Sequence, residues 1–445
     1  MKEIRSPLFH TKKTDHQFMY YKADGICRVE PDEAPELDHH AFGIALSDAF
    51  CEKPFCREFI GQAVSFSEGG PVFCVLSLRM DGNTRNSHPE EAIGPARILQ
   101  EVCKEEKGLW GATGWFRFAC LFPEKTGTEG LYIANRIQNR LSHELCRTVT
   151  IGVAAYPLAG FTNDRTLENA EKALMHAAFF GPDSAVVFDA VSLNISGDAF
   201  YQNGNLAEAV AEFKAALEID PNNVNVHNSL GVCLGQMGDL DGALNHFNRA
   251  RSMDPQDSMV WYNTGLIYKF QKNTEKALEF FLKAGEIDEN LFEAAFQAGK
   301  IYFEKNLPEI GKQYYRKAID LKPGNNLNYR FLGECYMEMG MVDDAVAAYK
   351  KAILEHPNDA VALSTLGTLY AEKGENPEIA VLFCRQSIEI APENALLHHR
   401  LGEVYEKQSM HENALLSFKK AFELGYDASV DIERIETVIN GSDIN

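Results

Sequence analysis

The 445-residue sequence contains no apolar run long enough to cross a membrane. Its first residues, MKEIRSPLFHTKKTDHQ, are polar and charged and lack the apolar core of a secretory signal. The ten cysteines form no CxxC pair, and neither HExxH nor the P-loop pattern GxxxxGKS/T occurs, which excludes the commonest zinc and nucleotide motifs. These absences favour a cytoplasmic protein whose cysteines are reduced and mostly buried.

Basic charge is also scarce, since the formal net charge is −21. Nucleic-acid binding needs basic side chains that replace the counterions of the phosphate backbone. Residues 1–189 carry 20 basic and 26 acidic side chains, whereas residues 190–445 carry 23 and 38. We therefore expect no general nucleic-acid binding, and we expect the acidic surface to favour solubility or a basic partner.

A repeat of 34 residues, with one step of 35, occupies the C-terminal half of the chain. In each unit a glycine is followed, in register, by a small residue, an aromatic residue and a second small residue. The glycines are Gly197, Gly231, Gly265, Gly299, Gly333, Gly367 and Gly402. The aromatic residues are Phe213, Phe247, Phe281, Tyr315, Tyr349 and Phe418, and Cys384 takes this place in the sixth unit. This register predicts seven helix pairs, in which small residues let two helices approach and the aromatic ring fills the space between them.

The pattern resembles the tetratricopeptide repeat (TPR) family at nearly every signature position. The resemblance implies an all-α solenoid over residues 190–428 and a capping helix and tail over 429–445. It also implies that a protein or peptide binds the concave face, which each unit's first helix lines. Carried onto this sequence, that face would hold Asn228, Tyr262, Asn263, Phe296, Lys300, Phe303, Arg330, Phe331, His399 and Arg400. The alternative is that many of these side chains only solvate or pad the groove. The chaperone-type carboxylate clamp is not matched, because Asp198 stands where that clamp needs a neutral amide.

Between residues 46 and 189 the apolar periodicity changes, and strands alternate with helices. The predicted strands are 73–78, 116–122, 148–156 and 185–188, and the predicted helices are 91–106, 129–143 and 167–180. This order predicts an α/β or α+β domain built on one sheet.

Three runs of this domain resemble the GGDEF domain of diguanylate cyclases: DAFCEKPFCREF at 48–59, IGVAAYP at 151–157 and AEKALMHA at 170–177. The resemblance implies the palm-like fold of nucleotide cyclases. At the family's signature loop this sequence reads GWFRF (114–118), so Arg117 replaces a metal-binding acidic residue. Arg79 replaces the family's metal-binding aspartate at the end of the first strand. Because Mg²⁺ needs oxygen ligands, we expect a degenerate domain with no metal, no cofactor and no catalytic activity.

The sequence therefore predicts a non-catalytic interaction scaffold in bacterial cytoplasmic signalling. One alternative is a nucleotide or anion sensor in which Arg79 and Arg117 form an anion site, and an active diguanylate cyclase is least favoured. The GGDEF-like domain could also mediate self-association. Residues 1–45 form an N-terminal extension that does not match that domain, and the acidic, proline-bearing run 29–38 is interpreted as a linker.

Overall fold

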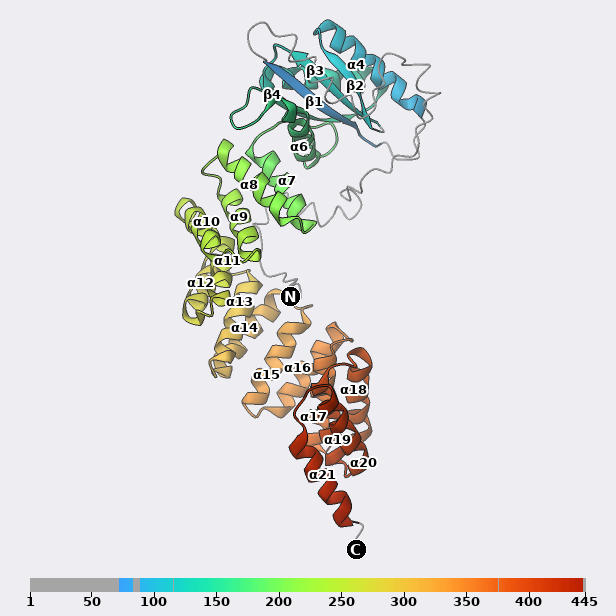
Figure 1. Ribbon diagram of the computed structural model, residues 1–445, viewed down its shortest axis with the longest axis vertical. Coiled ribbons are helices and arrows are strands. Elements are labelled where there is room, and N and C mark those ends of the chain that lie inside the picture. The colour runs from blue at the N-terminus through green and yellow to red at the C-terminus, as the bar shows by residue number, and fades with distance from the viewer. Residues whose placement is uncertain (1–71, 83–88, 115, 375, 443–445) are drawn as a thin grey trace. The chain divides into compact units, whose positions relative to one another are not determined.

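The computed structural model describes residues 72–82, 89–114, 116–374 and 376–442 (Figure 1). The N-terminal extension and the run 48–59 lie outside these residues. The chain divides into two compact units, residues 1–263 and 264–445. In the described ranges, no helix has both the length and the apolar character that a membrane span requires.

The first unit begins with an α+β domain built on one five-stranded sheet, in the order β2-β3-β1-β4-β5. The strands are β1 (Phe73–Met80), β2 (Leu109–Gly114), β3 (Arg117–Pro123), β4 (Val149–Tyr156) and β5 (Ala185–Val187). Strand β1 runs antiparallel to both β3 and β4, whereas β5 is parallel to β4. The first four strands and the two helices between them follow a β-α-β-β-α-β order with two split β-α-β units.

Three helices cover the two faces of this sheet. Alternate residues of each strand point to opposite faces, so each face has its own set of apolar side chains to bury. Helices α4 (Ile93–Glu105) and α5 (Gly127–Leu145) pack on the face that holds Leu76 and Leu78 of β1. Helix α6 (Thr166–Ala178) packs on the opposite face, which holds Phe73 and Val75. Helix α6 lies so close to β4 that a Cβ atom on Gly152 would be 2.1 Å from the carbonyl oxygen of Ala170.

The predicted α+β domain is thus confirmed, and each of its predicted strands and helices has a counterpart in the structure. Strand β2 was not predicted. Its sequence, LWGATG, contains two glycines and has no alternation of apolar and polar residues. Its pairing with β3 makes it the outer strand of a hairpin, and this neighbour provides the hydrogen bonds that the local sequence does not signal.

The rest of the chain is helical and forms successive helix pairs joined by short turns. In the first unit these helices are α7 (Ala190–Gln202), α8 (Leu206–Ile219), α9 (Val224–Gln236) and α10 (Leu240–Met253). Helix α11 (Ser258–Phe270) spans the boundary between the units. The second unit continues with α12 (Thr274–Ile287), α13 (Phe292–Glu304), α14 (Pro308–Leu321), α15 (Asn326–Glu338), α16 (Val342–Glu355), α17 (Ala360–Lys373), α18 (Pro377–Ile390), α19 (Ala395–Lys407), α20 (His411–Glu423) and α21 (Ser429–Ser442).

The repeat glycines sit where the two helices of a pair come closest. A Cβ atom on Gly231 would lie 2.6 Å from the ring of Phe247, and one on Gly402 would lie 2.6 Å from the ring of Phe418. In the sixth pair the neighbour is the sulfur of Cys384, 2.5 Å from the Cβ position of Gly367. This is the close approach that the repeat register predicts.

The 35-residue step and the final helix each have a structural counterpart. Helix α17 has 14 residues, one more than α15 or α19. It is capped by the following residue, Gly374, whose φ of 66° suits a residue without a side chain. In α21, Ile435 is buried against the last helix pair, and Ile432 and Ile439 pack beside it. Val430 and Val438, on the same helix, are exposed.

The sheet and the first repeats share one hydrophobic core within the first unit. Phe73 and Val75 of β1 belong to the same buried cluster as Leu193 of α7 and Phe213 of α8. Figure 1 shows α6 beside α7 at this junction. The first helix pair therefore packs beside α6 and extends the hydrophobic core on this face of the sheet.

Candidate functional site

An aromatic stack runs from the core of the second unit to its surface, and it is formed by Tyr315 of α14 and by residues of the first helices α13 and α15. The ring of Phe331 (α15) stacks on the buried ring of Tyr315, with centroids 5.6 Å apart and planes 12° apart. Phe296 (α13) packs edge-on against Phe331 at 5.5 Å. Phe296 and Phe331 are partly exposed, so each offers part of its ring to solvent. Phe303 packs against the same hydrophobic cluster.

Two cations lie close to the ring of Phe331. The ammonium of Lys300 lies 5.8 Å from the ring centroid of Phe331, and the guanidinium carbon of Arg330 lies 5.2 Å from it. Arg330 Nη1 is 3.4 Å from Asp359 Oδ1, but Arg330 Nε is buried without a hydrogen-bond partner. Asp359 is already engaged, because it accepts bonds from the backbone N–H of Ala362 and from the side chain of Asn326.

Arg400 (α19) brings a third cation to the same region. Its Nη1 donates to Ser364 Oγ at 2.7 Å and to Thr365 Oγ1 at 2.8 Å, which ties α19 to α17. Burial raises the pKa of Glu334, and the positive charges of Arg330, Arg400 and Lys300 oppose that rise. The three cations thus lie within electrostatic reach of one carboxyl group.

We call Phe296, Lys300, Arg330, Phe331 and Arg400 the cation–aromatic patch. All five are residues that the repeat register assigns to the binding face. Sequence reasoning did not identify Glu334 or Asp359 beside them. Glu334 directly follows the repeat glycine, as Lys300 does, so the register contained a signal for its position.

The remaining predicted face residues contact other parts of the protein in the structure. Asn228 and Asn263 are fully buried, and Asn263 Nδ2 donates to Asn228 Oδ1 at 3.0 Å. Tyr262 is also buried. His399 bonds Asp431 of α21 through Nε2 at 3.0 Å, and its ring packs at a tilt against that of Tyr426, with centroids 4.3 Å apart. These four side chains hold helices together in this conformation.

The arginines at the proposed decayed metal site are neighbours in the sheet. Arg79 and Arg117 are directly paired residues of β1 and β3. Arg117 is exposed, and its charge opposes the raised pKa that burial gives Glu171 of α6. The nearby Asp81 has both carboxylate oxygens occupied: Oδ1 accepts from Thr150 Oγ1 at 2.6 Å, and Oδ2 accepts from the backbone N–H of Asp183 at 2.9 Å.

These residues do not fit a magnesium ion, because two guanidinium groups supply no oxygen ligand and Asp81 is committed to structural bonds. Across the residues that the structure describes, no group of three or more His, Cys, Asp or Glu side chains is arranged to hold a metal.

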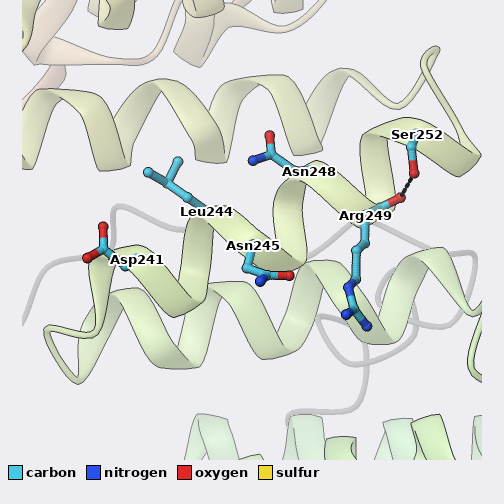
Figure 2. Close-up of a pocket in the computed structure, with 6 residues that line it drawn as sticks. All are labelled: Asp241, Leu244, Asn245, Asn248, Arg249 and Ser252. Atoms are coloured by element: carbon cyan, nitrogen blue, oxygen red, sulfur yellow. Dashed lines mark hydrogen bonds between the residues drawn. The ribbon is translucent and has the colours of Figure 1, made fainter.

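A shallow depression on α10 is a separate surface feature (Figure 2). Its lining residues are Asp241, Leu244, Asn245, Asn248, Arg249 and Ser252. The one hydrogen bond drawn there runs from Ser252 Oγ to the backbone oxygen of Arg249, at 2.7 Å. All six residues come from a single helix, and one acid and one base among neutral side chains offer no catalytic arrangement.

Four family models match parts of the helical region. A TPR repeat model matches residues 197–238, and tetratricopeptide repeat models match residues 230–290, 292–325 and 311–369. No curated protein matches the chain.

Several solved structures are similar to the helical region. A tetratricopeptide repeat protein from Parabacteroides merdae is 22% identical, covering 55% of this chain and 96% of its own, with a TM-score of 0.41. Pseudomonas aeruginosa pilF is 21% identical, covering 46% and 92%, with a TM-score of 0.42. YrrB, a TPR protein described as having an unusual peptide-binding site, is 22% identical, covering 42% and 96%, with a TM-score of 0.37. The matches to the repeat models confirm the prediction from the sequence register: this chain carries an array of tetratricopeptide repeats.

Proposed function

We propose that this protein is a non-catalytic scaffold that binds a segment of a partner protein on the cation–aromatic patch. The observation that carries the proposal is the placement of two cations, Lys300 at 5.8 Å and Arg330 at 5.2 Å, near the ring centroid of the partly exposed Phe331. Aromatic and arginine side chains dominate the binding energy of protein interfaces. A partly exposed ring with cations nearby offers a partner both an apolar anchor and charge-assisted hydrogen bonds.

The test is partner capture with the full chain, because the first repeats share their core with the sheet and a truncated array would lose that support. The informative variant is Lys300→Glu, since Lys300 makes no ion pair with any described residue and its loss should leave the fold intact. Lys317→Glu is the matched control, because Lys317 lies exposed on α14 and undergoes the same charge change. A partner held by wild type and Lys317→Glu but lost by Lys300→Glu supports the proposal. Equal capture by all three proteins places the partner elsewhere.

We further propose that residues 46–189 form a degenerate GGDEF-like domain that serves the scaffold in bacterial cytoplasmic signalling. The support is the three resembling sequence runs, the β-α-β-β-α-β order, and arginines where that family binds metal. Two-metal phosphoryl transfer needs cations that neutralise developing charge, and Arg79 and Arg117 would repel them. Purified protein given GTP and Mg²⁺ should form no cyclic di-GMP, and any product would overturn this assignment.

A second candidate function is anion sensing by the same domain. It is favoured by the direct pairing of Arg79 with Arg117 across two strands, which puts two guanidinium-bearing residues at one end of the sheet. Calorimetry with GTP and with cyclic di-GMP tests it. A sensor is supported if the wild-type protein binds either ligand and both Arg79→Ala and Arg117→Ala lose that binding. If the wild-type protein gives no heat of binding with either ligand, anion sensing is excluded for these two ligands.

A further inference from the structure

We propose that Lys269 is a modification site, at which small acyl phosphates acylate the side-chain amine while Lys300 holds their phosphate group and Gln297 positions the amine. Lys269 lies in the last turn of α11, and Gln297 and Lys300 lie on α13, the first helix of the next pair. Acylation of Lys269 does not require a partner on the cation–aromatic patch, although Lys300 takes part in both.

The amine of Lys269 is hydrogen-bonded to a neutral group. Its Nζ donates to Gln297 Oε1 at 2.6 Å, and the Gln297 side chain is buried. Lys305, which bridges the same two helix pairs, instead lies 2.9 Å from the carboxylate of Glu275. A carboxylate stabilises the ammonium form, whereas an amide oxygen can accept a hydrogen bond from the ammonium or from the neutral amine. The bond to Gln297 therefore holds the Lys269 nitrogen in place without fixing its proton.

Burial and a neighbouring cation favour the neutral amine at this position. Burial lowers the pKa of Lys269 to about 8, and the positive charge of Lys300 adds to this effect, while the charge of Glu304 opposes it. The last turn of a helix also favours a cation, so burial and Lys300 together outweigh both opposing effects. At pH 8 about half of the Lys269 side chains are therefore unprotonated, against well under 1% for a lysine at the ordinary pKa of about 10.4.

Both lysines are accessible to a small reagent. The side chains of Lys269 and Lys300 are each partly exposed. Lys300 forms no hydrogen bond or ion pair with the described residues, and its ammonium lies 5.8 Å from the ring centroid of Phe331, so its N–H groups can bind an anion. An acyl phosphate joins an anionic group to an electrophilic carbonyl carbon, and it therefore matches a cation beside a nucleophilic amine.

The reaction is an acyl transfer from phosphate to nitrogen. The Lys269 nitrogen attacks the carbonyl carbon of the acyl phosphate and forms a C–N bond. The bond from that carbon to the phosphate oxygen breaks, and phosphate leaves with the bonding electrons. The nitrogen loses one proton, which the leaving phosphate takes up, so the products are an amide on Lys269 and hydrogen phosphate. The amide carries no charge, so acylation removes one positive charge close to Lys300.

The experiment treats the full-length wild-type protein with acetyl phosphate across a pH series, and mass spectrometry measures the acetylation rate of each lysine. At pH 8 we expect Lys269 to react about tenfold faster than the exposed Lys317 of α14, because its larger unprotonated fraction outweighs the lower nucleophilicity of a weaker base. The rate at Lys269 should rise with pH and level off above about pH 8, where the amine has lost its proton. A rate at Lys269 no higher than that at Lys317 would overturn the proposal.

Three variants of the full chain test the neighbouring groups. Gln297→Glu keeps the shape of the side chain but places a carboxylate beside Lys269, so acetylation at pH 8 should slow by about tenfold or more. Lys300→Gln should slow acetylation by acetyl phosphate more than acetylation by p-nitrophenyl acetate, because the uncharged ester has no anion for Lys300 to bind. Lys317→Gln is the matched control for Lys300→Gln and should change neither rate at Lys269.

The contradicting outcomes differ for each group. Unchanged acetylation of Lys269 in Gln297→Glu would overturn the role of the neutral hydrogen bond. Equal slowing with both reagents in Lys300→Gln would overturn the phosphate contact. The comparison of Lys269 with Lys317 is made within the wild-type protein, so it does not depend on whether a variant folds.

Discussion

Lys172 Nζ lies 2.8 Å from Glu212 Oε1, and both side chains are almost fully buried between α6 of the sheet domain and α8 of the first repeat. Glu168 contributes a second carboxylate at 2.7 Å from the same ammonium. Glu212 Oε2 has no hydrogen-bond partner, so Lys172 is its only compensating charge among these contacts. This ion pair fixes the first repeat to the sheet and makes the repeat array a poor candidate for separation from the domain before it.

Lys172→Met is expected to lower the free energy of unfolding by about 3–5 kcal/mol, because it leaves the Glu212 carboxylate buried without its cation. Urea denaturation of the full chain measures this change. The control is Lys283→Met, which removes one end of an exposed ion pair with Glu286 and should cost at most about 0.5 kcal/mol. The double variant Lys172→Met, Glu212→Leu should recover most of the loss. A double variant as unstable as the single one would contradict the role given to the buried charge.

Gly152→Ala is expected to prevent close packing of α6 on the sheet. A Cβ atom there would lie 2.1 Å from the backbone nitrogen of Leu174 as well as from Ala170 O, and backbone atoms cannot rotate away. We expect a loss of more than about 3 kcal/mol or no folded protein. Gly285→Ala is the matched control: its Cβ atom would meet only Ala294 Cβ at 3.8 Å, and within α12 it should stabilise by up to about 1 kcal/mol. Equal thermal unfolding temperatures of the two variants would contradict the tight packing of α6 on the sheet at Gly152.

Asp198→Asn is expected to stabilise the protein at pH 8. Burial raises the pKa of Asp198 to about 7, and its Oδ1 has no hydrogen-bond partner. A raised pKa means that the folded state binds more protons than the unfolded state between about pH 4 and 7, so this group's contribution to stability falls as pH rises through that window. The gain should be about 1–3 kcal/mol at pH 8 and should shrink toward pH 4. Asp241→Asn, at an exposed position, should change little, and a pH-independent effect of Asp198→Asn would contradict the assignment.

His246 is expected to give the opposite pH dependence. His227 Nε2 donates to the carbonyl oxygen of Pro221, so its Nδ1 accepts the 2.9 Å bond from His246 Nδ1. Burial lowers the pKa of His246 to about 4, and the charges of His227 and Arg249 add to this effect.

A lowered pKa means that the unfolded state binds more protons between about pH 4 and 6.5, so stability is retained above pH 6.5 and is lost as pH falls toward 4. His246→Gln keeps a donor without a titrating ring. It should flatten the slope of unfolding free energy against pH in this window by at most about 1.4 kcal/mol per pH unit. Parallel curves for wild type and variant would show that His246 does not titrate there.

Local pattern and repeat register account for most of the fold. The position of Phe331 follows from its place two residues before Gly333, and the same rule places Arg400 two residues before Gly402. The glycine and aromatic positions of each pair follow from the steric need for close helix contact. Strand β2 could not be predicted, because its glycines and its short length carry no periodic signal and its stability comes from β3.

Features that depend on distant contacts were not accessible from the sequence. Lys172 and Glu212 are 40 residues apart, and nothing local marks either as buried. Asn228 and Asn263 occupy neighbouring register positions of a predicted open face, yet successive first helices pack closely enough to bury both and join their amides. Register specifies the direction in which a side chain leaves its helix. Burial depends on how closely the next helix packs.

Amine-reactive footprinting of the full chain, with and without its captured partner, tests binding at the cation–aromatic patch. Lys300 and Lys317 are read in the same sample by mass spectrometry, so Lys317 serves as an internal control for labelling. If the partner binds the cation–aromatic patch, its binding should slow the modification of Lys300 several-fold and leave that of Lys317 unchanged. Equal rates at Lys300 in the free and bound protein would contradict binding at the cation–aromatic patch.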